Sequence, residues 1–165
     1  MKGYYYKFQT PIGTMYIGFT SKGIVKLNLP GENEDEMLDF LKKYFDDVVE
    51  LEENKADYHK EILSYLDGDL KEFSVPIDLY GTSFQKEVWN ELLKIPYGMT
   101  RTYKDVAIAL GTEKLSRTVG NGCNRNPIPI IVPCHRVVGK NFNLTGYRGG
   151  LSLKKKFLEI EGIKF

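Results

Sequence analysis

The stretch 130–139 constrains the fold of this chain more than any other part of the sequence. An apolar run, Ile130–Val132, leads directly into Pro133. Because proline donates no backbone hydrogen bond and restricts the residue before it, the run predicts a buried strand that ends abruptly. The apolar pair Val137–Val138 predicts that a second extended segment follows. Cys134 is therefore expected at a bend, where its side chain has little freedom.

Cys134 is followed immediately by His135, a candidate base. A nearby imidazole can lower a cysteine pKa from about 8.5 into the range of roughly 3.5–7.5, and the resulting thiolate is the nucleophilic form. A free cysteine is also commonly a small buried hydrophobe, and a histidine is commonly satisfied by backbone groups. The two residues alone leave both interpretations open.

Acidic and basic side chains are distributed unevenly along the chain. Residues 1–80 carry 9 basic and 16 acidic side chains, a net charge of −7, whereas residues 81–165 carry 14 basic and 6 acidic side chains, a net charge of +8. Together they give the net charge of +1. The asymmetry predicts two units, an N-terminal domain at 1–78 and a C-terminal domain at 79–165, of which the second meets a polyanion.

The first half predicts an antiparallel sheet with helices against it. Turn residues separate three segments of strand character, Tyr4–Phe8, Met15–Phe19 and Ile24–Leu29. Asn33 and Glu36 have the spacing of a helix cap, and the helix after them places apolar residues on one face. Val48–Val49 is a candidate short strand. A second helix is expected at Tyr58–Leu66, with His59 solvated or capping and without a chemical role.

The second half predicts a helical domain. Thr82 and Gln85 have capping-box spacing at the start of one helix. Trp89, the only tryptophan of the chain, is expected in the core. A last helix is expected at 152–161 and ends before Gly162, a residue type that suits the position after a helix.

A helix-turn-helix pattern lies between these two helices. Thr102 caps a short helix that ends at Gly111, and a third helix is expected at 113–123. The third helix contains Gly120 and Gly122, which are poor helix formers but let a backbone come close to a partner. In a basic domain, this pattern favours a face that reads DNA.

Six motifs of the second half resemble those of the O6-alkylguanine-DNA alkyltransferases and stand in that family's order. They are Gly81-Thr82-x-Phe84-Gln85-x-x-Val88-Trp89, Thr102-Tyr103, Ser116-Arg117-x-Val119-Gly120, Asn126-Pro127-x-Pro129, Pro133-Cys134-His135-Arg136 and Gly146-Tyr147-x-Gly149-Gly150. The resemblance covers this half nearly continuously and the first half only loosely. It implies an α+β fold: an N-terminal ribonuclease-H-like three-stranded antiparallel sheet with helices, and a C-terminal helical domain with a winged-helix-like helix-turn-helix.

The resemblance also implies a DNA-repair activity. Such a protein flips O6-alkylguanine, and also O4-alkylthymine, out of duplex DNA and transfers the alkyl group irreversibly to its own cysteine, here Cys134, in a single turnover. His135 and Glu161 would form a relay with the thiol through a bridging water, and Asn126 would hold the thiol loop. Tyr103 would rotate the phosphate and donate a hydrogen bond to the purine.

By the same resemblance, further residues contact DNA and line the substrate pocket. Arg117 would fill the stack that the flipped base vacates. The predicted DNA-binding residues are Arg117, Tyr103, Gly120, Gly122 and Arg125. The predicted pocket residues are Val137, Tyr147, Arg148, Gly149 and Lys154, with the backbone of Val137 and Arg148 reading the guanine edges.

The composition indicates which sites and partners to expect. Two cysteines and two histidines show no paired metal-ligand spacing, so no metal is expected, and no cofactor motif is visible. So few cysteines indicate a reducing cytoplasm, and no apolar stretch approaches the length of a membrane span. We expect a monomer whose partner is double-stranded DNA carrying O6-alkylguanine.

Two other functions remain open. Cys134, His135 and Glu161 could serve a cysteine hydrolase, although no local motif for an oxyanion hole is visible. The C-terminal half could instead be a DNA-lesion-binding module without transfer. Non-transferring relatives carry tryptophan at the position of Cys134, so the cysteine argues against that alternative.

Overall fold

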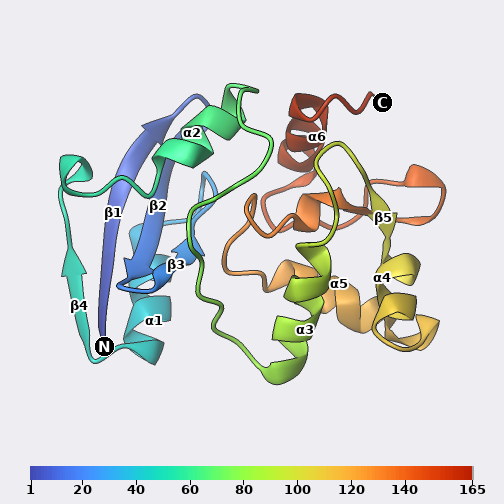
Figure 1. Ribbon diagram of the computed structural model, residues 1–165, viewed down its shortest axis with the longest axis horizontal. Helices are drawn as coiled ribbons and strands as arrows, with labels where there is room; N and C mark the ends of the chain where they lie inside the picture. The colour runs from blue at the N-terminus through green and yellow to red at the C-terminus, as the bar shows by residue number, and fades with distance from the viewer. Residues whose placement is uncertain (165) are drawn as a thin grey trace. The chain divides into compact units, whose positions relative to one another are not determined.

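The computed structural model describes residues 1–164. The chain divides into two compact units, one at Met1–Tyr80 and the other beginning at Gly81. The sequence placed this boundary two residues earlier, after residue 78. Both units contain helices and strands (Figure 1), which agrees with the predicted α+β class. Within residues 1–164, no helix is both long and apolar enough to span a membrane.

The N-terminal unit contains a four-stranded sheet. Its strands are β1 (Lys2–Thr10), β2 (Gly13–Thr20), β3 (Gly23–Leu27) and β4 (Asp47–Glu50). Their order is β3-β2-β1-β4, in which β4 is parallel to β1 and the other neighbours are antiparallel. The sheet thus has one strand more than the three predicted, because the candidate strand Val48–Val49 pairs with Gly3 and Tyr4 of β1.

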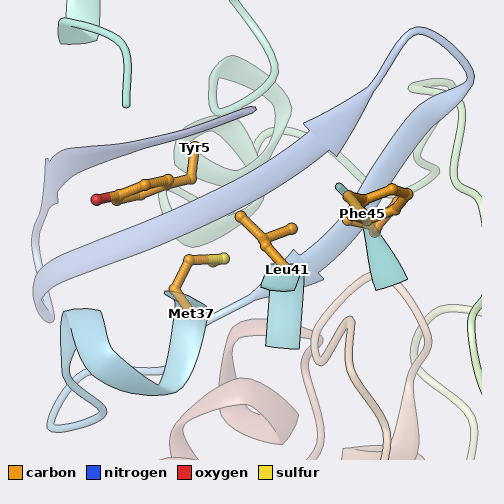
Figure 2. Packing of buried hydrophobic residues seen from close by; sticks show 5 residues of the cluster. Tyr5, Met37, Leu41 and Phe45 are labelled. Carbon is orange, nitrogen blue, oxygen red and sulfur yellow. The ribbon is translucent and has the colours of Figure 1, made fainter. Parts of the chain in front are cut away.

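Helix α1 (Glu34–Tyr44) covers one face of this sheet. The Asn33 side chain accepts a hydrogen bond from the Glu36 amide at 3.1 Å, which confirms the predicted cap. Met37 and Leu41 project from the helix onto buried side chains of the sheet (Figure 2). Truncating a fully buried Met or Leu to Ala costs about 2–5 kcal/mol, so these two residues hold the helix in place.

The segment that leads into helix α2 (Lys60–Leu66) packs on the other face, since successive strand residues point to opposite sides. A 3-10 turn, η1 (Glu53–Lys55), precedes it. His59 was expected to be solvated or capping, but it makes no capping hydrogen bond. Its Nδ1 lies 2.9 Å from the Tyr6 hydroxyl, its ring packs on Phe8 at 5.2 Å, and burial lowers its pKa. His59 is therefore part of the packing of this unit.

The C-terminal unit is mainly helical. Its α-helices are α3 (Ser83–Leu92), α4 (Tyr103–Ala109), α5 (Ser116–Asn124) and α6 (Leu151–Ile160). Short 3-10 turns lie at η2 (Glu113–Leu115) and η3 (Cys134–Arg136), whereas η4 (Lys140–Phe142) is a single turn with positive φ at Asn141 and Phe142. The short strands β5 (Arg101–Thr102) and β6 (Val137–Val138) pair in parallel. The predicted helix-turn-helix corresponds to α4, η2 and α5, which pack against one another. Its winged-helix character stays a prediction.

Local sequence signals account for the start and the packing of these helices. Both predicted capping boxes, at Thr82 and Thr102, are formed. Trp89 is buried, as predicted, and its indole Nε1 donates to the Gly122 carbonyl at 2.9 Å. A Cβ atom at Gly122 would lie 3.1 Å from a methyl group of Val88, so glycine allows α5 to approach α3 closely.

Candidate active site around Cys134

Cys134 begins the turn η3 and is 5% exposed. The residues before it do not form the predicted buried strand: Ile130–Val132 lie in a tight turn, where Ile130 has a φ of +75°. The Cys134 amide donates to the Val132 carbonyl at 2.8 Å. The strand prediction is wrong because these apolar side chains are buried by a loop whose hydrogen bonds are local. The following segment, Val137–Val138, does form the predicted extended structure.

Asn126 connects the end of α5 to this turn. Its side-chain amide Nδ2 donates to the Val132 carbonyl at 2.8 Å and to Cys134 Sγ at 3.2 Å. Its Oδ1 accepts a hydrogen bond from the Ile128 amide at 2.9 Å. Asn126 is fully buried, so each of these bonds is made away from water. These bonds fit the prediction that Asn126 holds the thiol loop, and one of them is made to the sulfur of Cys134.

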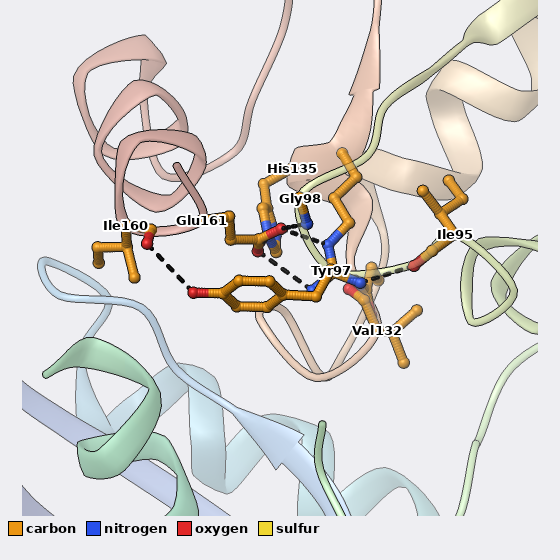
Figure 3. Close-up of polar contacts among 9 residues, drawn as sticks. Ile95, Tyr97, Gly98, Val132, His135, Ile160 and Glu161 are labelled. Atoms are coloured by element: carbon orange, nitrogen blue, oxygen red, sulfur yellow. Dashed lines mark hydrogen bonds and ion pairs between the residues drawn. The ribbon is translucent and has the colours of Figure 1, made fainter. Parts of the chain in front are cut away.

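His135, Arg136 and Glu161 form a buried polar cluster (Figure 3). His135 Nε2 lies 2.6 Å from Glu161 Oε2. Arg136 Nε donates to Glu161 Oε1 at 2.8 Å, and its Nη2 donates to Oε2 at 3.1 Å. The Gly98 amide donates to Oε1 at 3.0 Å, and Arg136 Nη1 donates to the Ile95 carbonyl at 2.7 Å. Both carboxylate oxygens are thus engaged by two donors each.

This cluster fixes the ionisation of its members. Burial alone would raise the pKa of Glu161, but the hydrogen bonds that its carboxylate accepts from His135, Arg136 and the Gly98 amide lower it to about 2. Burial lowers the pKa of His135, although the adjacent carboxylate opposes this change. Because an ionised carboxylate only accepts hydrogen bonds, the proton of the neutral imidazole lies on Nε2. The lone pair of the ring is then on Nδ1, so the imidazole can act as a base through that atom.

The pKa of Cys134 moves in the direction opposite to the one expected from its sequence neighbours. Burial raises the pKa of this thiol, and the Asn126 hydrogen bond and the charges of Arg148 and Lys154 oppose the rise only in part. The resting residue is therefore a thiol rather than the expected thiolate. Sequence adjacency to His135 could not reveal this, because the degree of burial decides the sign.

Arg136 is the member of the site that the sequence did not indicate as functional. It stands in the Pro133-Cys134-His135-Arg136 motif, and it is only 7% exposed. A guanidinium is rarely buried unless it is paired, so an arginine between the apolar segments Ile130–Val132 and Val137–Val138 is a usable signal. The charged partner that makes the burial of Arg136 possible is Glu161, a residue that only the family resemblance had indicated.

Tyr103 and Lys154 meet at one backbone carbonyl. The Tyr103 hydroxyl and Lys154 Nζ donate to the Thr145 carbonyl at 3.1 Å and 3.0 Å. Lys154 is fully buried, and Nζ lies 5.7 Å from the centre of the Tyr103 ring. Burial lowers the pKa of Lys154 and raises the pKa of Tyr103 to about 12.

The other predicted pocket residues lie in the segments on either side of this carbonyl. Val137 is buried in β6, while Tyr147 and Gly149 are half-buried. The Tyr147 ring packs edge-on against Phe157 with centroids 6.2 Å apart. Arg148 donates from Nη1 to the Asn126 carbonyl at 2.7 Å. Its guanidinium therefore binds the chain just after α5.

The predicted DNA-binding residues separate into an exposed group and a buried one. Arg117 and Arg125 are exposed, and Gly120 is half-buried, where a Cβ atom would lie 3.9 Å from the Tyr103 ring. Gly122 is buried against α3 and does not lie on an accessible face. The prediction for Gly122 is wrong because the close approach that it permits is made by α3 inside the unit. Cys123, its neighbour, is a free and buried thiol, and burial raises its pKa.

Comparisons with known proteins agree with this geometry. The family described as "6-O-methylguanine DNA methyltransferase, DNA binding domain" matches residues 83–163. A methylated-DNA–protein-cysteine methyltransferase from Methanosarcina acetivorans is 44% identical over 96% of this chain and 98% of its own length. The inducible methylated-DNA–protein-cysteine methyltransferase of Bacillus subtilis is 42% identical over 88% of this chain and 83% of its own.

A solved structure extends the likeness to the whole fold. The crystal structure of Mycobacterium tuberculosis OGT in complex with DNA matches with a TM-score of 0.81 at 35% sequence identity, and the match covers 96% of this chain and 92% of that one. Both the sequence relatives and this structure span nearly the full chain. The chain therefore belongs to the methylated-DNA–protein-cysteine methyltransferase family.

Proposed function

We propose that the protein repairs DNA by transferring the alkyl group of O6-alkylguanine, and of O4-alkylthymine, to Cys134 Sγ. One observation carries the assignment of the acceptor. Cys134 Sγ accepts a buried hydrogen bond from Asn126, and the next residue in the chain, His135, is hydrogen-bonded to Glu161. A nucleophile, an oriented base and a group that orients the base are the parts that activated-thiol chemistry requires.

The resting thiol must lose its proton before it can attack. A water between Sγ and His135 Nδ1 would carry the proton to the imidazole, and the Glu161 carboxylate would stabilise the imidazolium that forms. The sulfur then attacks the alkyl carbon, the C–S bond forms, and the bond from that carbon to guanine O6 breaks. The leaving guanine anion would accept a hydrogen bond from the Tyr103 hydroxyl and take up a proton from solvent. This proton balances the one that the bridging water passed to His135.

Access to the lesion requires extrusion of the nucleotide, which costs a few kcal/mol and costs less at a damaged pair. Arg117 is exposed near the start of α5 and would fill the vacated stack. Arg125 and Gly120 would contact the same strand, and Tyr103 would rotate the phosphate. In the pocket, the backbone of Val137 and Arg148 would read the guanine edges, and Tyr147, Gly149 and Lys154 would line the walls.

The transfer ends in a thioether, which has no proton to lose and is a poor leaving group. Each molecule therefore reacts once, and the protein is a single-turnover methyltransferase. We place it in the cytoplasm, because both cysteines are free and a reducing compartment keeps a nucleophilic thiol available. We propose that it acts as a monomer.

Intact-mass analysis after mixing with duplex DNA that carries O6-methylguanine tests the proposal. One methyl group on Cys134, and no further product with excess DNA, is the expected result. A Cys134→Ala variant should bind the same duplex and gain no mass. Continuous release of methanol, with guanine restored in the duplex at each turnover, would instead indicate a hydrolase. Binding without any mass gain by the unmodified protein would indicate a lesion-binding module.

A further inference from the structure

The turn Lys140–Asn143 has an unusual residue at its tip. The Asn143 amide donates to the Lys140 carbonyl at 3.2 Å, and the two central residues, Asn141 and Phe142, have φ values of +58° and +64°. Positive φ at both central positions, with this hydrogen bond, is characteristic of a type I′ turn, which favours Asn-Gly. Asn141 suits the first position, whereas Phe142 occupies the position where glycine is expected.

Phe142 is costly to the folded state at this position. A non-glycine residue in the left-handed region costs about 1–2 kcal/mol, and a bulky side chain there is a true outlier. Burial does not offset this cost fully, because Phe142 is 42% exposed. Strained backbone of this kind is found more often at functional sites than elsewhere in proteins.

The chain topology places the turn next to the helix-turn-helix. Thr102 pairs with Val138 in the parallel β5–β6 ladder. The start of α4, directly after Thr102, therefore lies beside the segment that runs from Val138 into the turn. On the other side of the turn, the Thr145 carbonyl is bound by Tyr103, the first residue of α4. Figure 1 shows this segment, in orange-red, at the edge of the C-terminal unit.

The charges of the segment suit a polyanion. Lys140 is exposed beside Phe142, and residues 139–150 contain Lys140 and Arg148 but no aspartate or glutamate. An apolar side chain flanked by a cation is a combination that proteins use on DNA, where the cation meets a phosphate and the apolar group contacts a sugar or an unstacked base.

We propose that Phe142 makes an apolar contact with the DNA strand that carries the extruded nucleotide, and that Lys140 meets the adjacent phosphate. This inference rests on the proposed function. Phe142 would increase the affinity for duplex DNA without acting on the sulfur, whose surroundings are formed by other residues. The positive φ of Phe142 is then tolerated because this backbone conformation places an aromatic residue at the tip of the turn.

Three variants separate the roles of the ring and of the backbone. Phe142→Gly removes the ring and relieves the strain, Phe142→Tyr keeps both, and Leu93→Ala removes a comparably exposed apolar side chain (40%) at the end of α3 as a control. Each is made in the Cys134→Ala background for binding to lesion-containing duplex, and in the unmodified background for alkyl transfer. Free O6-benzylguanine serves as the substrate without DNA.

Phe142→Gly should weaken binding of the duplex about tenfold, as expected for loss of one aromatic contact with nucleic acid. Its reaction with free O6-benzylguanine should be unchanged, and Phe142→Tyr and Leu93→Ala should bind the duplex normally. Unchanged duplex binding by Phe142→Gly would overturn the proposal. An equal loss of rate on free O6-benzylguanine would also overturn it, because the ring would then act on the adduct in the pocket.

The binding measurement needs no alkyl transfer. If the unmodified protein fails to transfer a methyl group while Phe142→Gly still binds duplex DNA about tenfold more weakly, the repair assignment fails and the DNA contact of Phe142 stands.

Discussion

Replacement of Glu161 tests the buried cluster most sharply. Burial would raise the pKa of this carboxyl, but donors from His135, Arg136 and the Gly98 amide lower it from 4.5 to about 2. A change of this size corresponds to about 3 kcal/mol of stabilisation, at about 1.4 kcal/mol per pH unit. Removing one partner of a buried ion pair costs about 3–5 kcal/mol in other proteins, which is the same magnitude.

We expect Glu161→Gln to lower the free energy of unfolding by about 3 kcal/mol at pH 7, and Tm by on the order of 10 °C for a chain of this length. The folded pKa lies below the unfolded value, so the stabilisation by the carboxylate is complete above about pH 5 and is lost as the pH falls from 4.5 towards 2. Urea unfolding of both proteins from pH 7 to pH 3 measures the effect. The contribution of the carboxylate should fall by roughly half by pH 3.

Glu159→Gln is the matched control. Glu159 lies on the same helix, is exposed and faces Lys155 at 3.9 Å. Its replacement should change the free energy of unfolding by less than about 0.5 kcal/mol. A Glu161→Gln protein as stable as the unmodified one at pH 7 would refute the reasoning. So would a stability difference that stays constant from pH 7 to pH 3, because the charge of the carboxylate would then contribute nothing.

Three further predictions concern other parts of the molecule. Asn126→Ala leaves the Val132 carbonyl and the Ile128 amide without their buried partner, so urea unfolding should show a loss of about 3 kcal/mol, and a loss below about 1 kcal/mol would contradict the holding role. Burial lowers the pKa of His59, so its contribution to stability is complete above about pH 6.5 and is lost at lower pH; His59→Gln should flatten this pH dependence, and an unchanged slope would show that other groups cause it. Methylation of Cys134 adds volume to a packed site and disturbs the Asn126 hydrogen bond, so the melting midpoint of the alkylated protein should fall, and equal midpoints would contradict this.

Local signals in the sequence were sufficient to place many elements. The caps at Asn33, Thr82 and Thr102 were predicted from spacing alone, because a capping side chain bonds to an amide only two or three residues away. The same is true of Trp89, whose large apolar surface makes a core position the natural expectation. Such contacts need no knowledge of the tertiary fold.

The errors have a common physical origin in long-range packing. Ile130–Val132 form a buried turn, and a buried turn needs apolar residues just as a buried strand does. The pattern of apolar residues therefore cannot distinguish a short buried turn from a short buried strand. Gly122 is required by the proximity of α3, which lies more than thirty residues earlier in the chain. The pKa of Cys134 depends on how completely the fold excludes water from the sulfur, and neighbouring residues in the sequence do not report that.

Glu161 and Arg136 mark the limit of reading the site from residues alone. The two side chains are 25 positions apart, and only the fold brings the carboxylate to the guanidinium at 2.8 Å. Family resemblance indicated Glu161 in advance but gave no reason for Arg136. The structure supplies that reason, since Arg136 adds two hydrogen bonds to the Glu161 carboxylate beside the one to His135 and helps to keep it ionised, which fixes the tautomer of His135.

The acceptor sulfur is tested most directly by peptide mass analysis of the protein after reaction with duplex DNA that carries O6-methylguanine. We predict one methyl group per molecule, located on the peptide that contains Cys134, with Cys123 unmodified and no second transfer when fresh DNA is added. A methyl group on any other residue, or continued consumption of lesions by a molecule that has already reacted, would contradict the proposed chemistry.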